Sequence, residues 1–377
     1  MALRAATRSA LSRLDISAPT PIQEQAIPLL LEGRDLIGQA RTGSGKTLAF
    51  AIPLVERCDP SSRQVQALVL VPTRELAIQV AAVTKSIASP HRLRVVLLYG
   101  GRSPRPESTE LRAGAQIVIG TPGRTLDHLR QGTLGLETVR LLVLDEADEM
   151  LDRGFAQDVE TILGRTPSSR QTALLSATMP AWVAKTATKH LRNPATAEID
   201  SDLQTLPTVQ HYVYTIGRGE KICALQSLLH QRDGMPVIVF GRTKHGVKKL
   251  ARQLSTLGFP VGALQGNLSQ NARERVMAAF RSGATPILVA TNVAARGLDV
   301  EGIGQVINYD LPDSEQLFTH RVGRTGRMGR TGEAVTFITP DEERKWQEIT
   351  RDLGRRFTCK PWNANRRVRS LQESTPH

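Results

Sequence analysis

The chain has 377 residues, of which 49 are Lys or Arg and 36 are Asp or Glu, so its formal charge is +13. A composition with 40% hydrophobic and 23% charged residues excludes a disordered or collagen-like chain, and no apolar run reaches the length of a membrane span. The excess of arginine over lysine favours a phosphate-rich partner, because guanidinium groups bind phosphate through paired hydrogen bonds. Three widely spaced cysteines indicate neither a disulfide framework nor a zinc site, so we expect a soluble, cytoplasmic protein.

Short apolar runs alternate with helical patterns in the first half of the chain. The N-terminal segment up to Leu14 has apolar residues at helical spacing, which favours a first helix over a transit peptide. We expect helices at Lys46–Arg57, Arg74–Ile87 and Arg124–Arg130. The expected strands are Asp35–Gln39, Ala67–Val71, Arg94–Leu98, Gln116–Gly120, Leu141–Leu144 and Thr172–Ser176. Apolar strands separated by helices indicate a parallel sheet that is covered on both faces.

The alternation stops at about residue 193, where prolines and acids replace the apolar pattern, and it resumes at about residue 209. Further strands are expected at Val237–Phe240, Val261–Leu264, Ile287–Thr291, Val306–Tyr309 and Ala334–Ile338, and helices at Lys221–His230, Lys244–Leu257, Arg273–Arg281 and Asp341–Arg355. The sequence therefore predicts an α/β protein with two tandem doubly wound parallel-sheet domains. Their predicted bounds are 1–194 and 209–358, with a flexible linker at 195–208 and a basic tail at 359–377.

A glycine-rich segment, Ala-Arg-Thr-Gly-Ser-Gly-Lys-Thr at residues 40–47, follows a predicted strand and begins a predicted helix. This is the context that a phosphate-binding loop requires, because glycines let backbone N–H groups approach phosphates at a helix N-terminus. Lys46 would reach the outer phosphates and Thr47 would bind Mg²⁺. The candidate nucleotide-binding residues here are Thr42, Gly43, Ser44, Gly45, Lys46 and Thr47.

Two carboxylates follow the predicted strand Leu141–Leu144. Asp145 would hold Mg²⁺, partly through water, and Glu146 would orient and deprotonate the attacking water. Downstream of a phosphate loop, this pair predicts hydrolysis of a nucleoside triphosphate.

Taken together, the motifs resemble those of the bacterial DEAD-box ATP-dependent RNA helicases, within the second helicase superfamily. The tetrad that names the family is Asp145–Asp148, and the other matching motifs are Pro19–Gln23, Pro72–Ala77, Gly100–Gly101, Thr121–Arg124, Ser176–Thr178, Phe240–Thr243, Gln270 with Arg273, Ala290–Asp299 and His320–Arg327. The match covers roughly residues 15 to 340, and Asn292 stands where Asp is common in the family. The resemblance implies two RecA-like domains.

The resemblance also implies roles for residues around ATP. Gln23 would contact adenine, and Gly297 and Asp299 would contact ATP from the second domain. Arg324 and Arg327 would act as arginine fingers on the γ-phosphate. Residues implied to couple the two domains, or hydrolysis to RNA, are His320, Asp148, Ser176 and Thr178.

Single-stranded or short duplex RNA is the implied partner, bound with low sequence specificity because phosphate contacts carry little base information. The residues implied to contact RNA are Pro72, Thr73, Arg74, Gly100, Gly101, Thr121, Gly123, Arg124, Arg242, Gln270, Arg273 and Thr291. The general outline resembles bacterial enzymes of ribosome assembly, RNA turnover or cold adaptation, which implies ribonucleoprotein partners.

The favoured hypothesis is an RNA-dependent ATPase that unwinds short RNA duplexes locally and without processive translocation, with ATP and Mg²⁺ as cofactors. One alternative is an ATP-gated RNA clamp that does not unwind. The other is a DNA helicase of the same superfamily, against which the Gln23 motif and the Asp145–Asp148 tetrad argue.

Overall fold

The computed structural model describes residues 3–40, 44–198, 209–232, 234–292, 302–326 and 331–363. The chain divides into two compact units, Met1–Ser201 and Asp202–His377. Within the described residues each unit contains a seven-stranded sheet in which all strand pairs are parallel. The predicted fold class is therefore confirmed. No helix in these ranges has the length and apolarity needed to cross a membrane.

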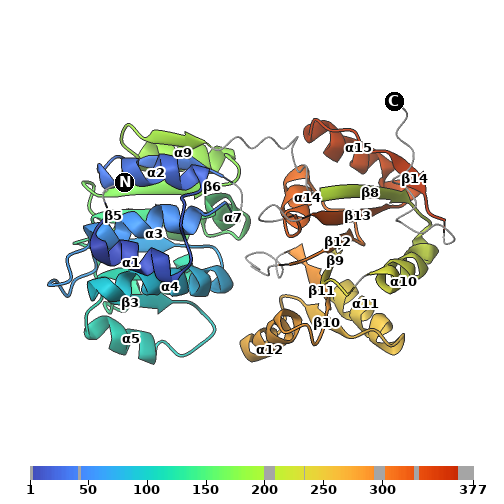
Figure 1. The fold of residues 1–377 in the computed structure, drawn as a ribbon, viewed down its shortest axis with the longest axis horizontal. Coiled ribbons are helices and arrows are strands. Elements are labelled where there is room, and N and C mark those ends of the chain that lie inside the picture. The colour runs from blue at the N-terminus through green and yellow to red at the C-terminus, as the bar shows by residue number, and fades with distance from the viewer. Residues whose placement is uncertain are drawn as a thin grey trace. The chain divides into compact units, whose positions relative to one another are not determined.

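The sheet of the first unit has the strand order β3-β4-β2-β5-β6-β1-β7, and Figure 1 labels β3, β5 and β6 of this sheet. Its strands are β1 (Leu36–Gln39), β2 (Ala67–Leu70), β3 (Val95–Leu98), β4 (Ile117–Gly120), β5 (Leu141–Leu144), β6 (Gln171–Ser176) and β7 (Ala195–Glu198). Its helices are α1 (Ala5–Arg13), α2 (Pro21–Leu31), α3 (Lys46–Arg57), α4 (Arg74–Ala88), α5 (Arg105–Arg112), α6 (Pro122–Arg130), α7 (Ala147–Asp152), α8 (Ala156–Leu163) and α9 (Ala181–His190).

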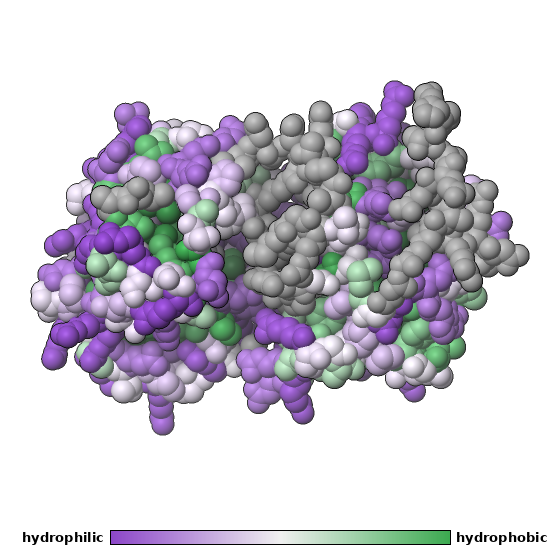
Figure 2. Space-filling model, in the orientation of Figure 1, coloured by the Kyte–Doolittle hydropathy of each residue, from purple (hydrophilic) through white to green (hydrophobic). Residues whose placement is uncertain are grey.

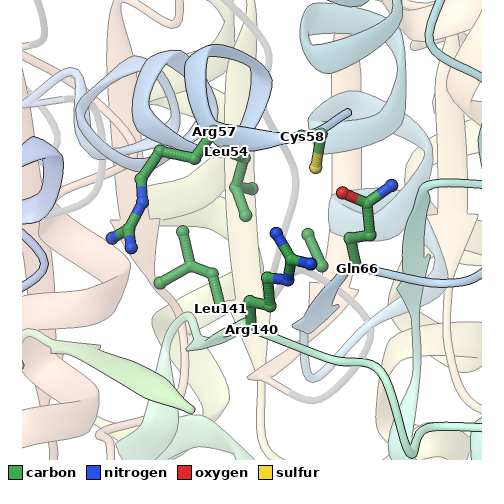
Figure 3. Close-up of a pocket in the computed structure, with 7 residues that line it drawn as sticks. Leu54, Arg57, Cys58, Gln66, Arg140 and Leu141 are labelled. Carbon is green, nitrogen blue, oxygen red and sulfur yellow. The ribbon is translucent and has the colours of Figure 1, made fainter. Parts of the chain in front are cut away.

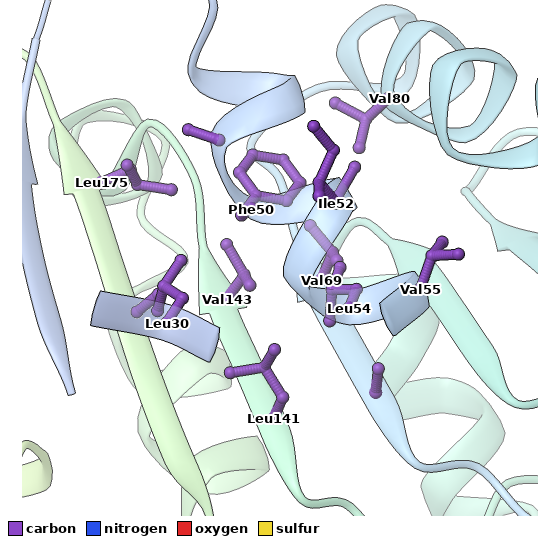
Figure 4. Packing of buried hydrophobic residues seen from close by; sticks show 14 of the residues in the cluster. Leu30, Phe50, Ile52, Leu54, Val55, Val69, Val80, Leu141, Val143 and Leu175 are labelled. Atoms are coloured by element: carbon purple, nitrogen blue, oxygen red, sulfur yellow. The ribbon is translucent and has the colours of Figure 1, made fainter. Parts of the chain in front are cut away.

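The central strands of this sheet are buried on both faces. Every residue of β2, β4, β5 and β6 is buried, which requires helices on both sides. One apolar layer joins the sheet to α2, α3 and α4, with Phe50 and Leu54 of α3 packed near Val143 of β5 (Figure 4). A second layer joins it to α6, α7, α8 and α9. Hydrophilic residues are spread over the visible face of this unit, with apolar residues between them (Figure 2).

The sheet of the second unit has the strand order β10-β11-β9-β12-β13-β8-β14. Its strands are β8 (Val209–Thr215), β9 (Val237–Gly241), β10 (Val261–Leu264), β11 (Ile287–Thr291), β12 (Gln305–Asn308), β13 (Gly332–Ile338) and β14 (Cys359–Pro361). Its helices are α10 (Lys221–Gln231), α11 (Lys244–Thr256), α12 (Gln270–Arg281), α14 (Glu315–Val322) and α15 (Glu343–Asp352). Helices α10 and α11 share one apolar cluster with the sheet, whereas α12 belongs to a second and α14 and α15 to a third.

Two predicted irregular segments contain strands. Ala195–Glu198, placed in the linker, forms β7 and pairs with β1; its buried positions are alanines, which give too weak a hydrophobic alternation to recognise. Cys359–Pro361, placed in the basic tail, forms β14 and pairs with β8, and Trp362 beside it packs edge-on against Tyr214 at 5.0 Å between ring centroids. Residues 199–208 and 364–377 lie outside the described residues.

Candidate functional site

The motifs of the first unit follow the carboxyl ends of its strands. The phosphate loop follows β1, Asp145 follows β5 and Ser176 ends β6, while the Pro72, Gly100 and Thr121 motifs follow β2, β3 and β4. Because these strands are parallel, all of these residues lie at one edge of the sheet, where doubly wound proteins bind their ligands.

The lysine of the phosphate loop forms a hydrogen bond to the residue at the start of the loop. Lys46 begins α3 and is 6% exposed, and its Nζ donates to the carbonyl oxygen of Ala40 at 2.6 Å. Gly45 has φ +94°, and a Cβ there would lie 2.6 Å from Nε2 of Gln23, so the loop requires glycine. Ser44 carries a buried Oγ without a hydrogen-bond partner among the described residues. Thr42 and Gly43 lie outside the described residues.

Gln23 connects the Pro19–Gln23 motif to the phosphate loop. Its Nε2 donates to the carbonyl oxygen of Gly45 at 3.0 Å, and its Oε1 accepts from the backbone N–H of Thr20 at 3.1 Å. The amide therefore ties the start of α2 to the phosphate loop.

The acidic tetrad occupies a buried turn between β5 and α7. Asp145 is 2% exposed, and burial raises its pKa to about 7; nearby Lys46 opposes this rise and Glu146 adds to it. Glu146 has a left-handed backbone, φ +52° and ψ +54°, a conformation that costs about 1–3 kcal/mol for a residue with a side chain and is concentrated at functional sites. A further buried acid, Glu149, has its pKa raised to about 8 by burial and by Glu146, although it pairs with Arg153 at 2.8 Å.

Asp148 binds the Ser176–Thr178 motif directly. Its Oδ2 accepts from the backbone N–H of Thr178 at 3.0 Å and from the Thr178 hydroxyl at 2.8 Å. The backbone N–H of Asp148 donates to Oγ of Ser176 at 3.2 Å. The structure thus brings together all three residues of the first unit that were predicted to couple hydrolysis to RNA.

Arg74 lies against the Gly100–Gly101 turn. Gly101 has φ +86°, and a Cβ there would lie 2.6 Å from the guanidinium carbon of Arg74. Thr73 caps α4 by accepting from the backbone N–H of Leu76 at 3.1 Å. The left-handed backbone at position 101 favours glycine there, and the absence of a side chain leaves room for the guanidinium of Arg74.

A buried ion cluster joins this turn to the Thr121–Arg124 motif. Its centre is Glu107, which is 1% exposed and binds Arg124 at 2.7 Å, Arg102 at 2.9 Å and His128 at 2.9 Å. Arg124 also donates to the carbonyl oxygen of Arg102 at 2.7 Å. Arg124, which was predicted to contact RNA, is therefore engaged within the protein, and sequence reasoning missed Glu107 and His128 as its partners.

In the second unit the predicted RNA-contacting residues lie at the ends of two strands and at the start of one helix. Arg242 follows β9; its backbone N–H donates to Oδ2 of Asp310 at 2.8 Å, and its guanidinium pairs with Glu342 at 3.0 Å. Thr291 ends β11. Gln270 and Arg273 lie in the first turn of α12, which Ser269 caps.

The His320–Arg327 motif begins in α14. Arg324 is buried, and its Nε donates to the carbonyl oxygen of His320 at 3.2 Å. Gly297, Asp299 and Arg327 lie outside the described residues.

Arg321, which lies in the His320–Arg327 motif but was given no role of its own from the sequence, connects three segments. Its guanidinium donates to Oδ1 of Asn292 at 2.6 Å, to Oδ1 of Asn308 at 3.1 Å and to the carbonyl oxygen of Asp310 at 2.6 Å. Burial lowers its pKa to about 9, and it lies 5.1 Å from the ring centroid of Phe240. Arg321 thus joins the ends of β11 and β12 to α14.

Family models match most of the chain. The model for the DEAD/DEAH box helicase matches residues 20–186, and the model for the helicase conserved C-terminal domain matches residues 220–329. The chain belongs to the DEAD/DEAH box helicase family.

Curated relatives of this helicase are similar over most of their length. The DEAD-box ATP-dependent RNA helicase CshA of Geobacillus kaustophilus is 44% identical over 92% of this chain and 74% of its own. The RNA helicase CrhR of Synechocystis is 44% identical over 96% of this chain and 75% of its own. S. cerevisiae Dbp5 bound to RNA and ADP BeF3 matches with a TM-score of 0.88 and 30% identity, over 96% of this chain and 94% of that one. The helicase therefore has two RecA-like domains in tandem.

A cavity of about 190 Å³ lies at the other edge of the first sheet of this helicase. It is lined in part by Arg57, Cys58 and Arg140, and by the first residues of β2 and β5 (Figure 3). Burial raises the pKa of the Cys58 thiol to about 12. The cavity is remote from the motif edge and has no part in the nucleotide site.

Proposed function

We propose that this protein is an ATP-dependent RNA helicase, in which RNA stimulates ATP hydrolysis and hydrolysis drives local, non-processive unwinding of short duplexes. The observation that carries this proposal is the bond between the acidic tetrad and the Ser176–Thr178 motif, next to a phosphate loop on the same sheet edge. The relatives named as RNA helicases, and the Dbp5 structure with RNA and a nucleotide, support it.

The nucleotide would bind at the phosphate loop. Lys46 would exchange the carbonyl oxygen of Ala40 for the outer phosphates, and the buried hydroxyl of Ser44 would gain an acceptor there. Backbone N–H groups of the loop, from Thr42 and Gly43 to Gly45, would face phosphate oxygens. Gln23 would contact adenine while it continues to support the loop.

Thr47 and Asp145 would hold Mg²⁺, since hydroxyl and carboxylate oxygens are its preferred protein ligands. The ion would neutralise charge that develops on the phosphates. Asp145 must be ionised for this role, and because burial raises its pKa, metal binding would favour loss of any proton that it carries. Glu146, whose backbone is left-handed at the helix start, would accept a proton from the attacking water.

RNA would bind the sheet edge of each unit that carries the remaining motifs. In the first unit these contacts are Pro72, Thr73, Arg74, Gly100, Gly101, Thr121, Gly123 and Arg124; in the second they are Arg242, Gln270, Arg273 and Thr291. Backbone N–H groups and short side chains at helix starts suit a phosphate backbone. Arg124 would act mainly by positioning the Thr121 loop, because its guanidinium already binds Glu107.

Residues of the second unit would also take part in ATP hydrolysis. Arg324 and Arg327 would reach the γ-phosphate, and Gly297 and Asp299 would contact the nucleotide. His320 would help to couple the two domains. If binding of RNA and of ATP is coupled, as RNA-stimulated hydrolysis requires, each ligand would raise the affinity for the other by the same factor. This mechanism would operate in the cytoplasm.

Two assays separate this function from its rivals. An unwinding enzyme releases one strand of a short RNA duplex when ATP is added, whereas a clamp binds RNA with ATP and leaves the duplex paired. A DNA helicase would show equal stimulation of ATP hydrolysis by DNA and RNA.

A further inference from the structure

Helix α11 of the second unit has a strongly basic outer face. Its buried residues, Val247, Leu250, Ala251 and Leu254, pack into the apolar core. All the other residues of the helix are exposed, and none of them is acidic. Five basic side chains form the outer face: Lys244, His245, Lys248, Lys249 and Arg252. Three of the 10 lysines of the chain therefore lie on this one helix.

The charges of this face are not relieved within the described part of the chain. None of the ion pairs there includes one of the five side chains. Lys244 and Lys248, and likewise Lys248 and Arg252, are one turn apart and repel each other. Lys244 also lies in the first turn, where the helix dipole disfavours positive charge.

Helix α15 shows the ordinary arrangement of a charged surface helix. It carries Glu343, Arg344, Lys345, Glu348, Arg351 and Asp352. Lys345 pairs with Asp313 and Arg351 with Asp352. The single-sign face of α11 is therefore not a general feature of the surface of this unit, and its repulsion would be relieved by an anionic ligand.

The basic face begins at the predicted RNA edge. Only Arg242 and Thr243 separate α11 from β9, and Thr243 caps the helix by accepting from the backbone N–H of Gly246 at 3.0 Å. A helix of 13 residues spans about 20 Å. The basic side chains, from Lys244 to Arg252, cover about 12 Å of that length, starting at the motif edge, so the face could meet two or more successive phosphates.

We propose that the exposed face of α11 binds the phosphate backbone of RNA next to the segment that the motifs hold. This inference rests on the proposed RNA helicase function. Its exposed positions are basic or polar apart from Gly246, so the face lacks the aromatic and apolar anchors that dominate protein interfaces. Lysine ammonium groups and a helix N-terminus instead suit phosphates without regard to base sequence.

The test compares two single-stranded RNAs. The short one is the shortest oligonucleotide that gives full stimulation of ATP hydrolysis, and the long one is the same sequence extended on both sides. The variant is K248E/K249E/R252E, which leaves Lys244 and the predicted motif residues in place. Binding is measured by fluorescence anisotropy over a range of salt concentrations, and circular dichroism checks the fold.

For the long RNA, the variant is expected to weaken binding about tenfold or more and to reduce the slope of log affinity against log salt by about 2, since each single-strand phosphate contributes about 0.7. Affinity for the short RNA, and ATP hydrolysis saturated with it, should stay as in the wild type. The control R344E/R351E/R356E changes the net charge equally at other exposed arginines, and it should bind the long RNA nearly as the wild type does.

An unchanged affinity and salt slope for the long RNA would overturn the proposal, as would an equal loss in the control variant or with the short RNA. If α11 instead docked a protein, the substitutions would leave the affinity and the salt slope for the long RNA unchanged. Failure of the helicase assignment is distinct, because the wild type itself would then show no RNA-stimulated hydrolysis.

Discussion

The bond between Asp148 and Thr178 predicts a measurable stability difference. The Asp148 carboxylate is 7% exposed and accepts from the Thr178 hydroxyl at 2.8 Å and from its backbone N–H at 3.0 Å. Thr178→Val keeps the side-chain shape and the backbone bond but removes the hydroxyl donor. A hydrogen bond to a charged group contributes about 1.5–3 kcal/mol, so the free energy of unfolding of the first unit should fall by about that amount.

Tryptophan fluorescence reports this unit selectively. Of the three tryptophans, Trp182 lies in the first unit and Trp346 and Trp362 in the second. A background with both of the latter changed to Phe leaves Trp182 as the reporter during denaturant unfolding. Thr188→Val is the matched control, because that exposed hydroxyl binds only a carbonyl within its own helix, and it should change stability by less than about 0.5 kcal/mol.

A double-mutant cycle with Asp148→Asn isolates the pair. The coupling energy should be about 1–2 kcal/mol, within the range for residues in direct contact. The same Thr178→Val variant should lose more duplex unwinding than ATP hydrolysis. Additive effects of the two substitutions, or a loss of stability no larger than that of Thr188→Val, would refute the structural reasoning.

Four further outcomes follow from the structure. Glu146→Gln should keep ATP binding, measured by nucleotide fluorescence, and reduce steady-state hydrolysis by at least about 10²-fold, because the proposed base is lost; normal turnover would contradict this. Arg324→Ala should lower hydrolysis by about 10³ to 10⁵-fold with RNA affinity nearly unchanged, and equal losses of both would exclude a finger role. Arg124→Ala should reduce the free energy of unfolding of the first unit by about 3 kcal/mol, because it leaves the buried carboxylate of Glu107 without this ion pair. A variant that binds RNA less tightly but is as stable as the wild type would argue against a stabilising role for the Glu107 cluster. Burial lowers the pKa of His211 to about 4 in the folded protein, whereas the pKa of an unfolded histidine is about 6.5, so the fold favours the neutral ring. As the pH falls from 6.5 to 4, the free energy of unfolding of the second unit should therefore fall by about 3 kcal/mol, which Trp346 fluorescence during denaturant unfolding would measure. His211→Leu should remove this pH dependence.

The fold and the edge that carries the motifs were predictable because both depend on local patterns. Apolar strands between helices indicate a parallel sheet, and residues after parallel strands must share an edge. Strands β7 and β14 were missed because their own residues carry little hydrophobic signal. They are stabilised by pairing with β1 and β8, which no local pattern reports.

The ion-pair and hydrogen-bond partners of the motif residues could not be predicted from the sequence. Glu107 lies 17 residues before Arg124, and Arg321 meets Asn292 and Asn308 only after three segments have folded together. A charged residue in a polar helix such as α5 resembles an ordinary surface residue in sequence. Its burial becomes visible only when the turn after β3 and the start of α6 close around it.

The central claim is that RNA binding and ATP hydrolysis are coupled in this chain. The most direct test is the steady-state rate of ATP hydrolysis with single-stranded RNA and with DNA of the same sequence, for the wild type and for Glu146→Gln. The structure predicts that RNA raises the wild-type rate well above both the unstimulated rate and the rate with DNA, and that the variant stays inactive with either. A rate that RNA leaves unchanged, or that DNA raises equally, would contradict the assignment.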